Sequence, residues 1–353
     1  MNRIERTLRS IDRFQQRHRV PGFAFGVIKK YGDDRGGQLA ALLTYYSFLT
    51  LFPLLLLLVT ILGIVAGGNP SIEHRLEHSA FAQFPVIGSG SAEGPSLSNS
   101  IHALHANSTA GLVIGILGLI WGSQGAAQTG QFAMAQIWNV PNVVRPGFVP
   151  RLGRTFLLLG VFAIFLVLSS ALTAVTGWGH HTALTRVGGL AGSFLANALL
   201  YLTVFRVLTP KSIGTRPLVP GAIAGALGWT VLQSIGAELL EHQLRGSSQV
   251  YGTFAVVLGL IFWLYLVVNL STYAAEANVV LARRLWPRSM LQPPLTDADQ
   301  RVLAAIAKQE ERRPEQRVRV EFHPPVDEAR PSASASASPE PSAPEPTRAT
   351  PAG

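Results

Sequence analysis

The stretch that most constrains this chain covers residues 251–287. Residues 254–268 contain no charged side chain, polar residues then appear from Asn269 to Asn278, and the stretch closes on Arg283 and Arg284. Because a bilayer core is about 30 Å thick and a helix rises about 1.5 Å per residue, about 20 such residues suffice to cross a membrane. The stretch is longer than that, so we expect its polar part to lie inside a helix bundle or at the cytoplasmic interface.

Further long apolar runs precede this stretch. The chain is 48% hydrophobic and only 14% charged, which is too apolar for an ordinary soluble domain. The predicted membrane spans are about 39–66, 110–137, 155–178, 190–208, 220–240 and 252–282. The sequence therefore predicts an all-α polytopic membrane protein with six transmembrane helices in a bundle.

The basic residues predict the orientation of these spans. Connections one, three and five each carry a single Lys or Arg, namely Arg75, Arg186 and Arg245, whereas the other connections and both terminal segments are more basic. By the positive-inside rule, both termini are expected to be cytoplasmic. The net charge of +9 lies mainly beside apolar runs and in the terminal segments, so we expect membrane lipids and no nucleic acid as partners.

Four regions follow from this pattern. Residues 1–37 form a cytoplasmic amphipathic segment, which would lie on the membrane surface or pack on the protein's own cytoplasmic side. Residues 38–288 form the transmembrane domain, and 289–330 a cytoplasmic polar segment with a short helix capped by Thr296 or Asp297. Residues 331–353 are rich in Pro, Ser and Ala and are expected to be disordered.

Glycines recur at helical spacing in the second predicted span. Gly111, Gly115, Gly118, Gly122 and Gly125 stand three or four residues apart, and Gly221 and Gly225 repeat this spacing in the fifth span. Small residues at such steps let helix backbones approach closely in lipid. The glycine-rich faces are also the expected contact for a homo-oligomer.

Several motifs in order resemble one known family. They are the run GGQLAALLTYYSFLTLFPLLLLL, the segment IWNVP at 137–141 followed by basic residues, and a late block from LTPKSIGTRPLVPG to NLSTYAAEANVVLARR. Over roughly residues 20–288 the chain resembles the YihY/virulence factor BrkB family of bacterial inner-membrane proteins. The resemblance implies six transmembrane helices, with a role in moving lipid or lipid-linked molecules suspected for some members. The family's former ribonuclease label finds no support in these residues, and the tail after Pro287 lies outside the resemblance.

Polar side chains recur at similar depth in the first, second and sixth spans. The candidate substrate-binding residues are Tyr45, Tyr46, Ser47, Gln124, Gln128, Asn269, Tyr273 and Glu276. They would line a cytoplasm-facing polar cavity, although hydrogen bonds between helices explain the same residues without a substrate. For Glu276, the alternatives are a proton- or cation-coupled site, a headgroup contact, or a structural ion pair with Arg145, Arg151 or Arg206.

A basic rim is predicted on the cytoplasmic side, as a contact for anionic headgroups. Its residues are Arg145, Arg151, Arg154, Arg206, Lys211 and Arg216. Helix N-termini at Thr155 and Gly221 would add partial positive charge, although charges that merely set the topology give the same count.

Histidines suggest a metal site only at one place. His74 and His78 are four residues apart and would share a helix face, which is metal-ligand spacing, but solvated loop histidines are the favoured explanation and no metal is expected. No cofactor is expected, and no catalytic motif such as a P-loop or G-x-S-x-G is present. We therefore expect a non-enzymatic membrane protein that transports or flips a lipid or another anionic amphiphile, the alternative being a non-transporting scaffold or regulator.

Overall fold

The structure is a computed structural model that describes residues 3–66, 108–145, 147–176, 183–251 and 254–323. Its described residues form helices and connections without any strand, which confirms the all-helical prediction for this part of the chain. All described helices belong to one compact unit, Met1–Val320. The second unit, Glu321–Gly353, contributes three described residues without helix, and the expected disordered tail lies outside the described residues.

The long apolar runs form six long helices among the described residues. They are α3 (Gly36–Ala66), α7 (Ser108–Ile137), α8 (Phe148–Thr176), α9 (Ala183–Leu208), α10 (Val219–Tyr251) and α11 (Phe254–Arg283). Three stretches are long and apolar enough to cross a membrane within the described part, namely Ala191–Leu208, Arg216–Gly236 and Val257–Arg283. Six spans and cytoplasmic termini remain predictions.

Two helices extend further than their runs suggested. α8 begins at Phe148, so Pro150, Arg151 and Arg154 are helical where a basic loop was expected. α10 continues to Tyr251, through the polar residues that were read as a connection. Pro150 is compatible with helix because it stands in the first turn of α8, where backbone N–H groups have no partner within the helix.

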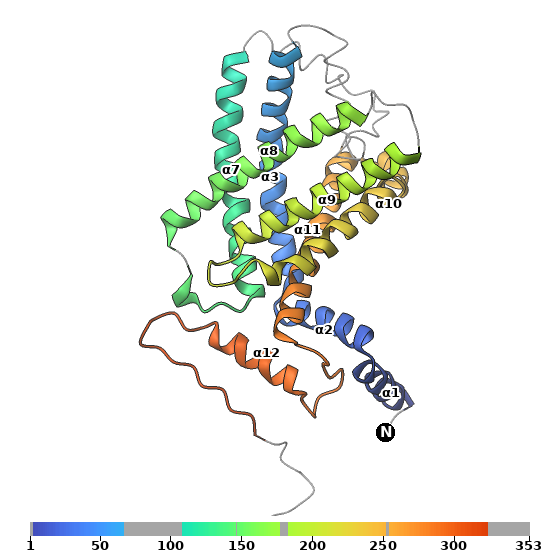
Figure 1. Cartoon of the computed structure of the whole chain (residues 1–353), viewed down its shortest axis with the longest axis vertical. Helices are drawn as coiled ribbons and strands as arrows, with labels where there is room; N and C mark the ends of the chain where they lie inside the picture. Colours follow the sequence, from blue (N-terminus) through green and yellow to red (C-terminus); the bar gives the residue numbers. More distant parts are fainter. Residues whose placement is uncertain (1–2, 67–107, 146, 177–182, 252–253, 324–353) are drawn as a thin grey trace, which may run out of the picture. The chain divides into compact units, whose positions relative to one another are not determined.

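Shorter helices lie beside the polar ends of the long ones. α1 (Arg3–Arg17) and α2 (Arg19–Asp33) precede α3, the short turns η1 (Asn142–Val144) and η2 (Arg216–Leu218) precede α8 and α10, and α12 (Asp297–Lys308) follows α11. Thr296 caps α12, since its hydroxyl accepts a hydrogen bond from the Asp299 backbone N–H, which confirms one of the two predicted caps. Figure 1 places α1, α2 and α12 at one end of this unit.

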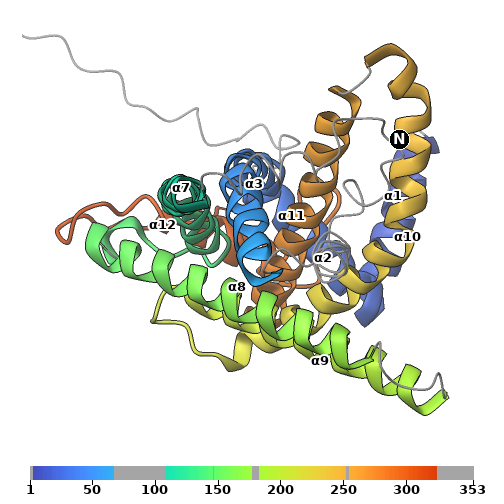
Figure 2. The same cartoon turned by 90° about the horizontal axis from the view of Figure 1, so that it is seen from above.

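α3 and α7 lie side by side (Figures 1 and 2), and glycines of α7 face α3 where the two helices meet. A Cβ added at Gly118 would lie 3.1 Å from Pro53 Cβ, one at Gly122 would lie 3.1 Å from Thr50 Cα, and Gly125 packs under the ring of Tyr46. The expected close helix approach therefore occurs within one chain. The homo-oligomer remains a prediction.

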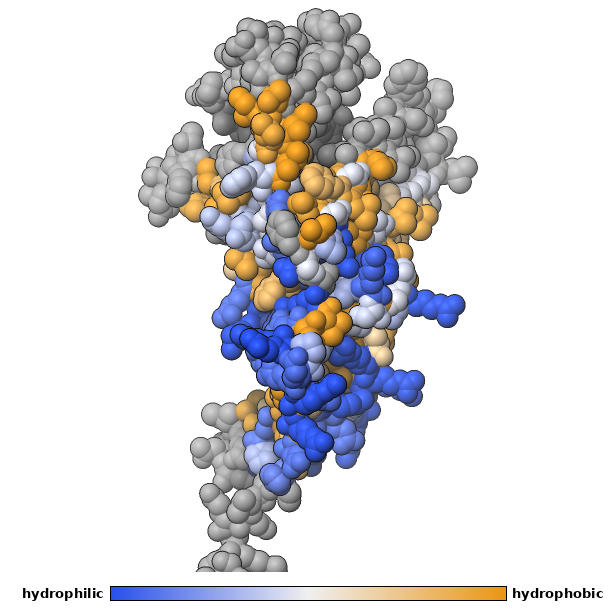
Figure 3. Space-filling model, turned by 90° about the vertical axis from the view of Figure 1, so that its left-hand side faces the viewer, coloured by the Kyte–Doolittle hydropathy of each residue, from blue (hydrophilic) through white to orange (hydrophobic). Residues whose placement is uncertain are grey.

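α11 packs against α2, α3, α7, α10 and η2, and so lies at the centre of the unit. A buried apolar cluster surrounds its second half and includes Ile137, Phe205, Leu218 and Val279. A smaller cluster forms around Trp263, Leu51 and Leu260. The described helices also expose large apolar side chains, for example Leu117, Trp121, Leu195 and Leu227, as expected of surfaces that face lipid. On the face in Figure 3, hydrophobic residues gather toward one end of the described chain and hydrophilic residues toward the other.

Candidate functional site

A cavity of about 290 Å³ lies among α3, α7, α8, α9, α10 and α11. Its lining is mainly hydrocarbon and includes Leu43, Phe162, Phe165, Val204, Phe205, Leu208, Val267 and Val268. Phe162 is 46% exposed, so the cavity reaches the surface of the described chain beside α8. The lining residues from α9 and α11 belong to two of the stretches that are long and apolar enough to cross a membrane.

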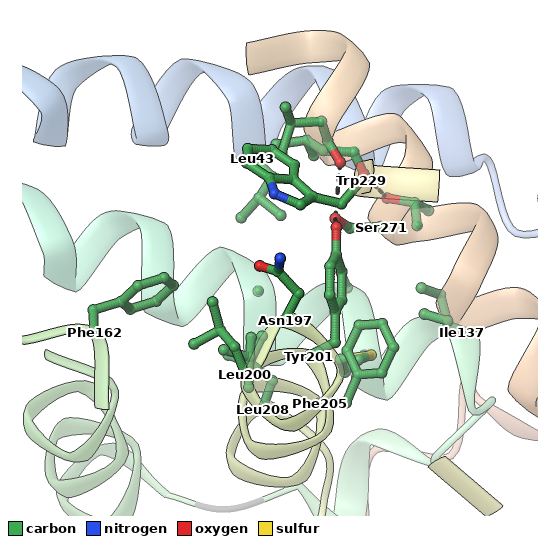
Figure 4. Close-up of a pocket in the computed structure, with 18 of the residues that line it drawn as sticks. Leu43, Ile137, Phe162, Asn197, Leu200, Tyr201, Phe205, Leu208, Trp229 and Ser271 are labelled. Carbon is green, nitrogen blue, oxygen red and sulfur yellow. Dashed lines mark hydrogen bonds between the residues drawn. The ribbon is translucent and has the colours of Figure 1, made fainter. Parts of the chain in front are cut away.

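A few polar side chains enter this apolar lining. Asn197 and Tyr201 project from α9 toward Trp229 and Ser271 (Figure 4). The Tyr201 hydroxyl lies 3.1 Å from Ser271 Oγ, and Ser271 in turn donates to the backbone oxygen of Val267 at 2.8 Å. Within the described part of the chain, the amide of Asn197 makes no hydrogen bond, so it is available to a ligand.

The polar residues predicted to line a cavity lie elsewhere. Among the described residues, none of the eight predicted substrate-binding side chains lines this cavity. Tyr45 is 56% exposed, Tyr46 packs on Gly125, and Ser47, Gln124 and Gln128 are partly buried on α3 and α7. Asn269, Tyr273 and Glu276 do come together, but as a packed contact with α2.

That contact begins with two stacked tyrosines. The rings of Tyr31 and Tyr273 stack with centroids 4.0 Å apart, and the Tyr31 hydroxyl donates to Asn269 Oδ1 at 2.7 Å. Burial, followed by the negative field of neighbouring groups that include Tyr265, Tyr273 and Glu276, raises the pKa of Tyr31 to about 12. Tyr31 therefore stays neutral and keeps its donor proton throughout the physiological range.

A buried charge cluster continues the contact. Its core is the triad of Lys30, Asp34 and Glu276, three side chains that are each at most 1% exposed. Lys30 Nζ pairs with Asp34 and lies 3.6 Å from Glu276 Oε2. The expected partners of Glu276 were Arg145, Arg151 or Arg206, and its ion-pair partner in the described chain is Lys30 instead.

Lys30 and Asp34 are not among the predicted site residues, because the amino-terminal segment has the pattern of an amphipathic surface helix. The signal available was the pair of opposite charges four residues apart, which marks a shared helix face. Nothing in the local pattern indicates that α11 packs on this face, because that contact is a feature of the tertiary structure.

Five of the six predicted rim residues fall into three parts, and the sixth, Arg151, is half-buried in the first turn of α8. Arg145 donates to Gln136 Oε1 at 3.2 Å and to the Val140 backbone oxygen, and it lies over the Phe132 ring. Burial and then the charge of Arg151 lower the pKa of Arg145. Lys211 and Arg216 are exposed in the connection before α10 and in η2.

Arg154 and Arg206 form the third part. They lie close enough for their charges to repel, and among the described residues neither has a carboxylate in an ion pair. Arg206 stands near the end of α9, on the helix face opposite the residues that line the cavity, and it donates to the Ile213 backbone oxygen at 2.8 Å. An anion bound between the two guanidinium groups would relieve this repulsion.

The two helix N-termini expected to add positive charge do not do so. Thr155 lies inside α8, where its hydroxyl donates to the Arg151 backbone oxygen at 3.2 Å. The Gly221 N–H at the start of α10 donates to Asn278 Oδ1 at 2.6 Å and is buried. His74 and His78 lie outside the described residues.

Comparison with known proteins adds a family. The family model described as Virulence factor BrkB matches residues 27–297. The match continues nine residues past residue 288, where the resemblance was expected to end. No solved structure matches the chain.

Similar curated proteins are named as membrane proteins in two of three cases. The inner membrane protein YhjD of Escherichia coli (strain K12) is 24% identical over 278 residues, which cover 74% of this chain and 81% of YhjD. A UPF0761 membrane protein of Stenotrophomonas maltophilia (strain R551-3) is 27% identical over 72% of this chain and 60% of its own length. The putative ribonuclease-like protein YfkH of Bacillus subtilis (strain 168) is 23% identical over 73% of this chain and 94% of its own length. Because the family model spans most of the sequence, this chain belongs to the BrkB family and is a membrane protein.

Proposed function

We propose that this protein binds the apolar part of an anionic amphiphile in the cavity among its helices and moves that amphiphile across the membrane without enzymatic chemistry. The observation that carries this proposal is the apolar cavity, which reaches the surface beside α8 and is lined in part by helices long and apolar enough to cross a membrane. Ligand pockets of about 300 Å³ or more that are mainly apolar, with a few placed polar groups, are typical sites for such molecules. Asn197 supplies a free amide for an ester or amide group of the ligand.

The headgroup contact is assigned to Arg154 and Arg206. Among the described residues these two guanidinium groups have no carboxylate partner, which favours a phosphate, since a phosphate can accept several charge-assisted hydrogen bonds. Arg154 stands about two turns before the cavity-lining Phe162 on α8, so a molecule whose chain occupies the cavity can extend along α8 to this pair. The other arginines contribute to topology and to internal hydrogen bonds.

One observation favours the competing proposal of a non-transporting scaffold. Asn269, Tyr273 and Glu276 pack against α2, so the polar path expected through the first, second and sixth spans is not their role here. The transport proposal therefore depends on the apolar cavity alone.

A pair of tryptophan substitutions tests the cavity. Leu200 lines it, whereas its neighbour Leu199 is 62% exposed on α9. In proteoliposomes that contain fluorescent phosphatidylglycerol, the fraction of probe reached by an external quencher reports movement between leaflets. We expect movement with the wild type, its loss in Leu200→Trp, and its retention in Leu199→Trp. Equal rates in wild-type and protein-free vesicles would support the scaffold instead.

Arg154→Gln tests the headgroup contact, with Lys211→Gln as the matched control. We expect Arg154→Gln to lose the preference for anionic over zwitterionic probe, because a charge-assisted contact is removed. Lys211→Gln removes the same charge at an exposed position and should keep the preference. An unchanged preference in both variants would exclude Arg154 from the site.

A further inference from the structure

The charge count of the Lys30–Asp34–Glu276 triad does not balance. Lys30 Nζ already pairs with Asp34 and donates to the Ile137 backbone oxygen at 3.1 Å. Glu276 is 0% exposed, and neither of its carboxyl oxygens has a hydrogen-bond donor in the described chain. One ammonium group thus faces two buried carboxyl groups.

The residues around the triad contribute more hydrogen-bond acceptors than donors. Asn139 donates through Nδ2 to Asp34 Oδ1 at 3.2 Å, while its own buried Oδ1 lacks a donor. Together with both Glu276 oxygens, three buried acceptor atoms around the triad are unsatisfied. An unsatisfied buried polar atom costs about 1–3 kcal/mol, and more when it is charged, so an added proton has a clear place to bind.

Other charged or titratable groups near the triad are few. Arg283 interacts with Asp34 through its charge but donates to the Trp138 backbone oxygen at 2.7 Å, and it is exposed. Tyr31 of α2, whose pKa is raised, stacks on Tyr273 of α11 close by. α3, α7 and residues 219–236 of α10 contain no charged residue, and Arg216 of η2 makes no ion pair with the triad among the described residues.

We propose that Asp34 and Glu276 together hold one exchangeable proton beside Lys30, which makes the contact between α2 and α11 a proton-binding site. The proton supplies the missing positive charge and one donor to the unsatisfied acceptors, and it needs no additional space. A metal cation in the same place would meet the Lys30 ammonium, which occupies the position between the carboxyl groups. Burial, opposed by Lys30 and Asn139, also raises the pKa of Asp34.

Infrared spectroscopy of the purified full chain in lipid nanodiscs tests the shared proton directly. A protonated carboxyl has a carbonyl stretching band that carboxylates lack and that moves when the protein is transferred to D₂O. We expect this band in the wild type at neutral pH. Either Glu276→Gln or Asp34→Asn leaves one carboxyl for one ammonium, so each variant should lose the band. Glu310→Gln, which removes an exposed carboxyl, should keep it.

A variant in which the band should grow serves as a control, because misfolding could also abolish the band. Lys30→Met leaves two buried carboxyls without the ammonium, so both should be protonated and the band should grow about twofold. The absence of the band in the wild type, or its persistence in both carboxyl variants, would overturn the shared proton. A wild-type band that disappears when sodium is added at constant pH would also overturn it, in favour of a cation site. Because the band reports carboxyl protonation and not the movement of lipid, its result is independent of the transport assay.

Discussion

At the scale of single residues, Asp299 is a buried carboxylate that, unlike those of the triad, has enough hydrogen-bond donors and positive charges around it to stay ionised. Its oxygens accept hydrogen bonds from Lys29 Nζ at 2.8 Å, Arg288 Nε at 2.5 Å and the Ser289 backbone N–H at 3.0 Å. Burial alone would raise the pKa of Asp299, but these donors, with the Thr296 hydroxyl, hold it well below its usual range. Asp299 therefore carries its charge at every physiological pH, in contrast with the triad, where one ammonium serves two carboxyls.

Asp299→Asn should destabilise the protein by about 3–5 kcal/mol at neutral pH, because the variant leaves Arg288 buried without its full counter-charge. Asp297→Asn, at an exposed position two residues earlier, should change stability by less than about 0.5 kcal/mol. Chemical unfolding of both variants in detergent measures the difference. Equal stabilities would show that the Asp299 network contributes little.

The pH dependence of the same contribution has a definite sign. A carboxyl whose folded pKa is lowered stabilises the fold at pH values above its unfolded pKa of about 3.9, and this contribution is lost as the pH falls below that value. The wild type should therefore lose its stability advantage over Asp299→Asn on acidification from about pH 5 downward. An advantage that stays constant to lower pH would contradict the ionised state assigned to Asp299.

At the scale of elements, a backbone N–H group at the start of α10 finds its hydrogen-bond acceptor on the neighbouring helix α11. The first N–H groups of a helix have no partner within it, and Asn278 of α11 accepts from the Gly221 N–H. Glycine is needed here because a Cβ at 221 would overlap the backbone oxygen of Ala274, which cannot rotate away. The close approach of α10 and α11 therefore depends on Gly221 and on its hydrogen bond to Asn278.

Gly221→Ala should therefore cost about 1–3 kcal/mol through forced separation of the two helices. Gly160→Ala in α8 is the matched control, since nothing lies within 4 Å of its added Cβ and alanine favours helix by about 1 kcal/mol. The two substitutions should thus change the free energy of unfolding in opposite directions. A neutral Gly221→Ala would mean that α10 can move without cost.

α1 packs its polar side inward. Gln15 Nε2 donates to the Arg288 backbone oxygen at 2.5 Å and the Met290 N–H donates to Asp12 Oδ1 at 3.1 Å, while Ile11 and Phe14 are 46% and 55% exposed. Packing on the protein's own chain, one of the two expected arrangements, thus leaves an apolar face for a membrane surface.

A polarity-sensitive fluorophore on α1 tests that membrane contact, and the absence of native cysteine makes single labels specific. A label at Phe14→Cys should emit at shorter wavelength when the protein is moved from detergent into anionic bilayers. A label at Gln16→Cys, an exposed polar position on the same helix, should change little. The same shift at both positions would indicate a general effect of the bilayer, not a docked face.

At the scale of the whole molecule, the sequence predicts helices better than their partners. The expected range 252–282 and the helix Phe254–Arg283 nearly coincide, because length and apolar content alone define such a helix. The cavity was beyond prediction, since α3 and α7 are apolar on all sides and their pattern does not separate a lipid-facing side from an inner one. The site residues Lys30, Asn197 and Tyr201 depend on which helices meet, and local patterns do not contain that information.

The basic segments also gather through tertiary contacts. The end of α7 accepts hydrogen bonds from Lys30 at Ile137, from Arg283 at Trp138 and from Gln309 at Gln136. The end of α2, the end of α11 and α12 therefore meet at the same end of α7, close to the basic connection that carries Arg145. This agrees with the positive-inside count, which assigns all of these segments to the cytoplasm.

Single cysteines can test this topology because the natural chain has none. A membrane-impermeant maleimide applied to intact cells should label Ser96→Cys in the first connection, which the charge count assigns to the outer side. Ser212→Cys, an exposed position in the basic connection before η2, should be labelled only after the cells are permeabilised. Labelling of both positions in intact cells would break the alternation on which six spans depend. Labelling of the Ser212→Cys variant alone in intact cells would show that the orientation is inverted. Arg154, Arg206 and the proton-binding triad would then lie toward the outer face.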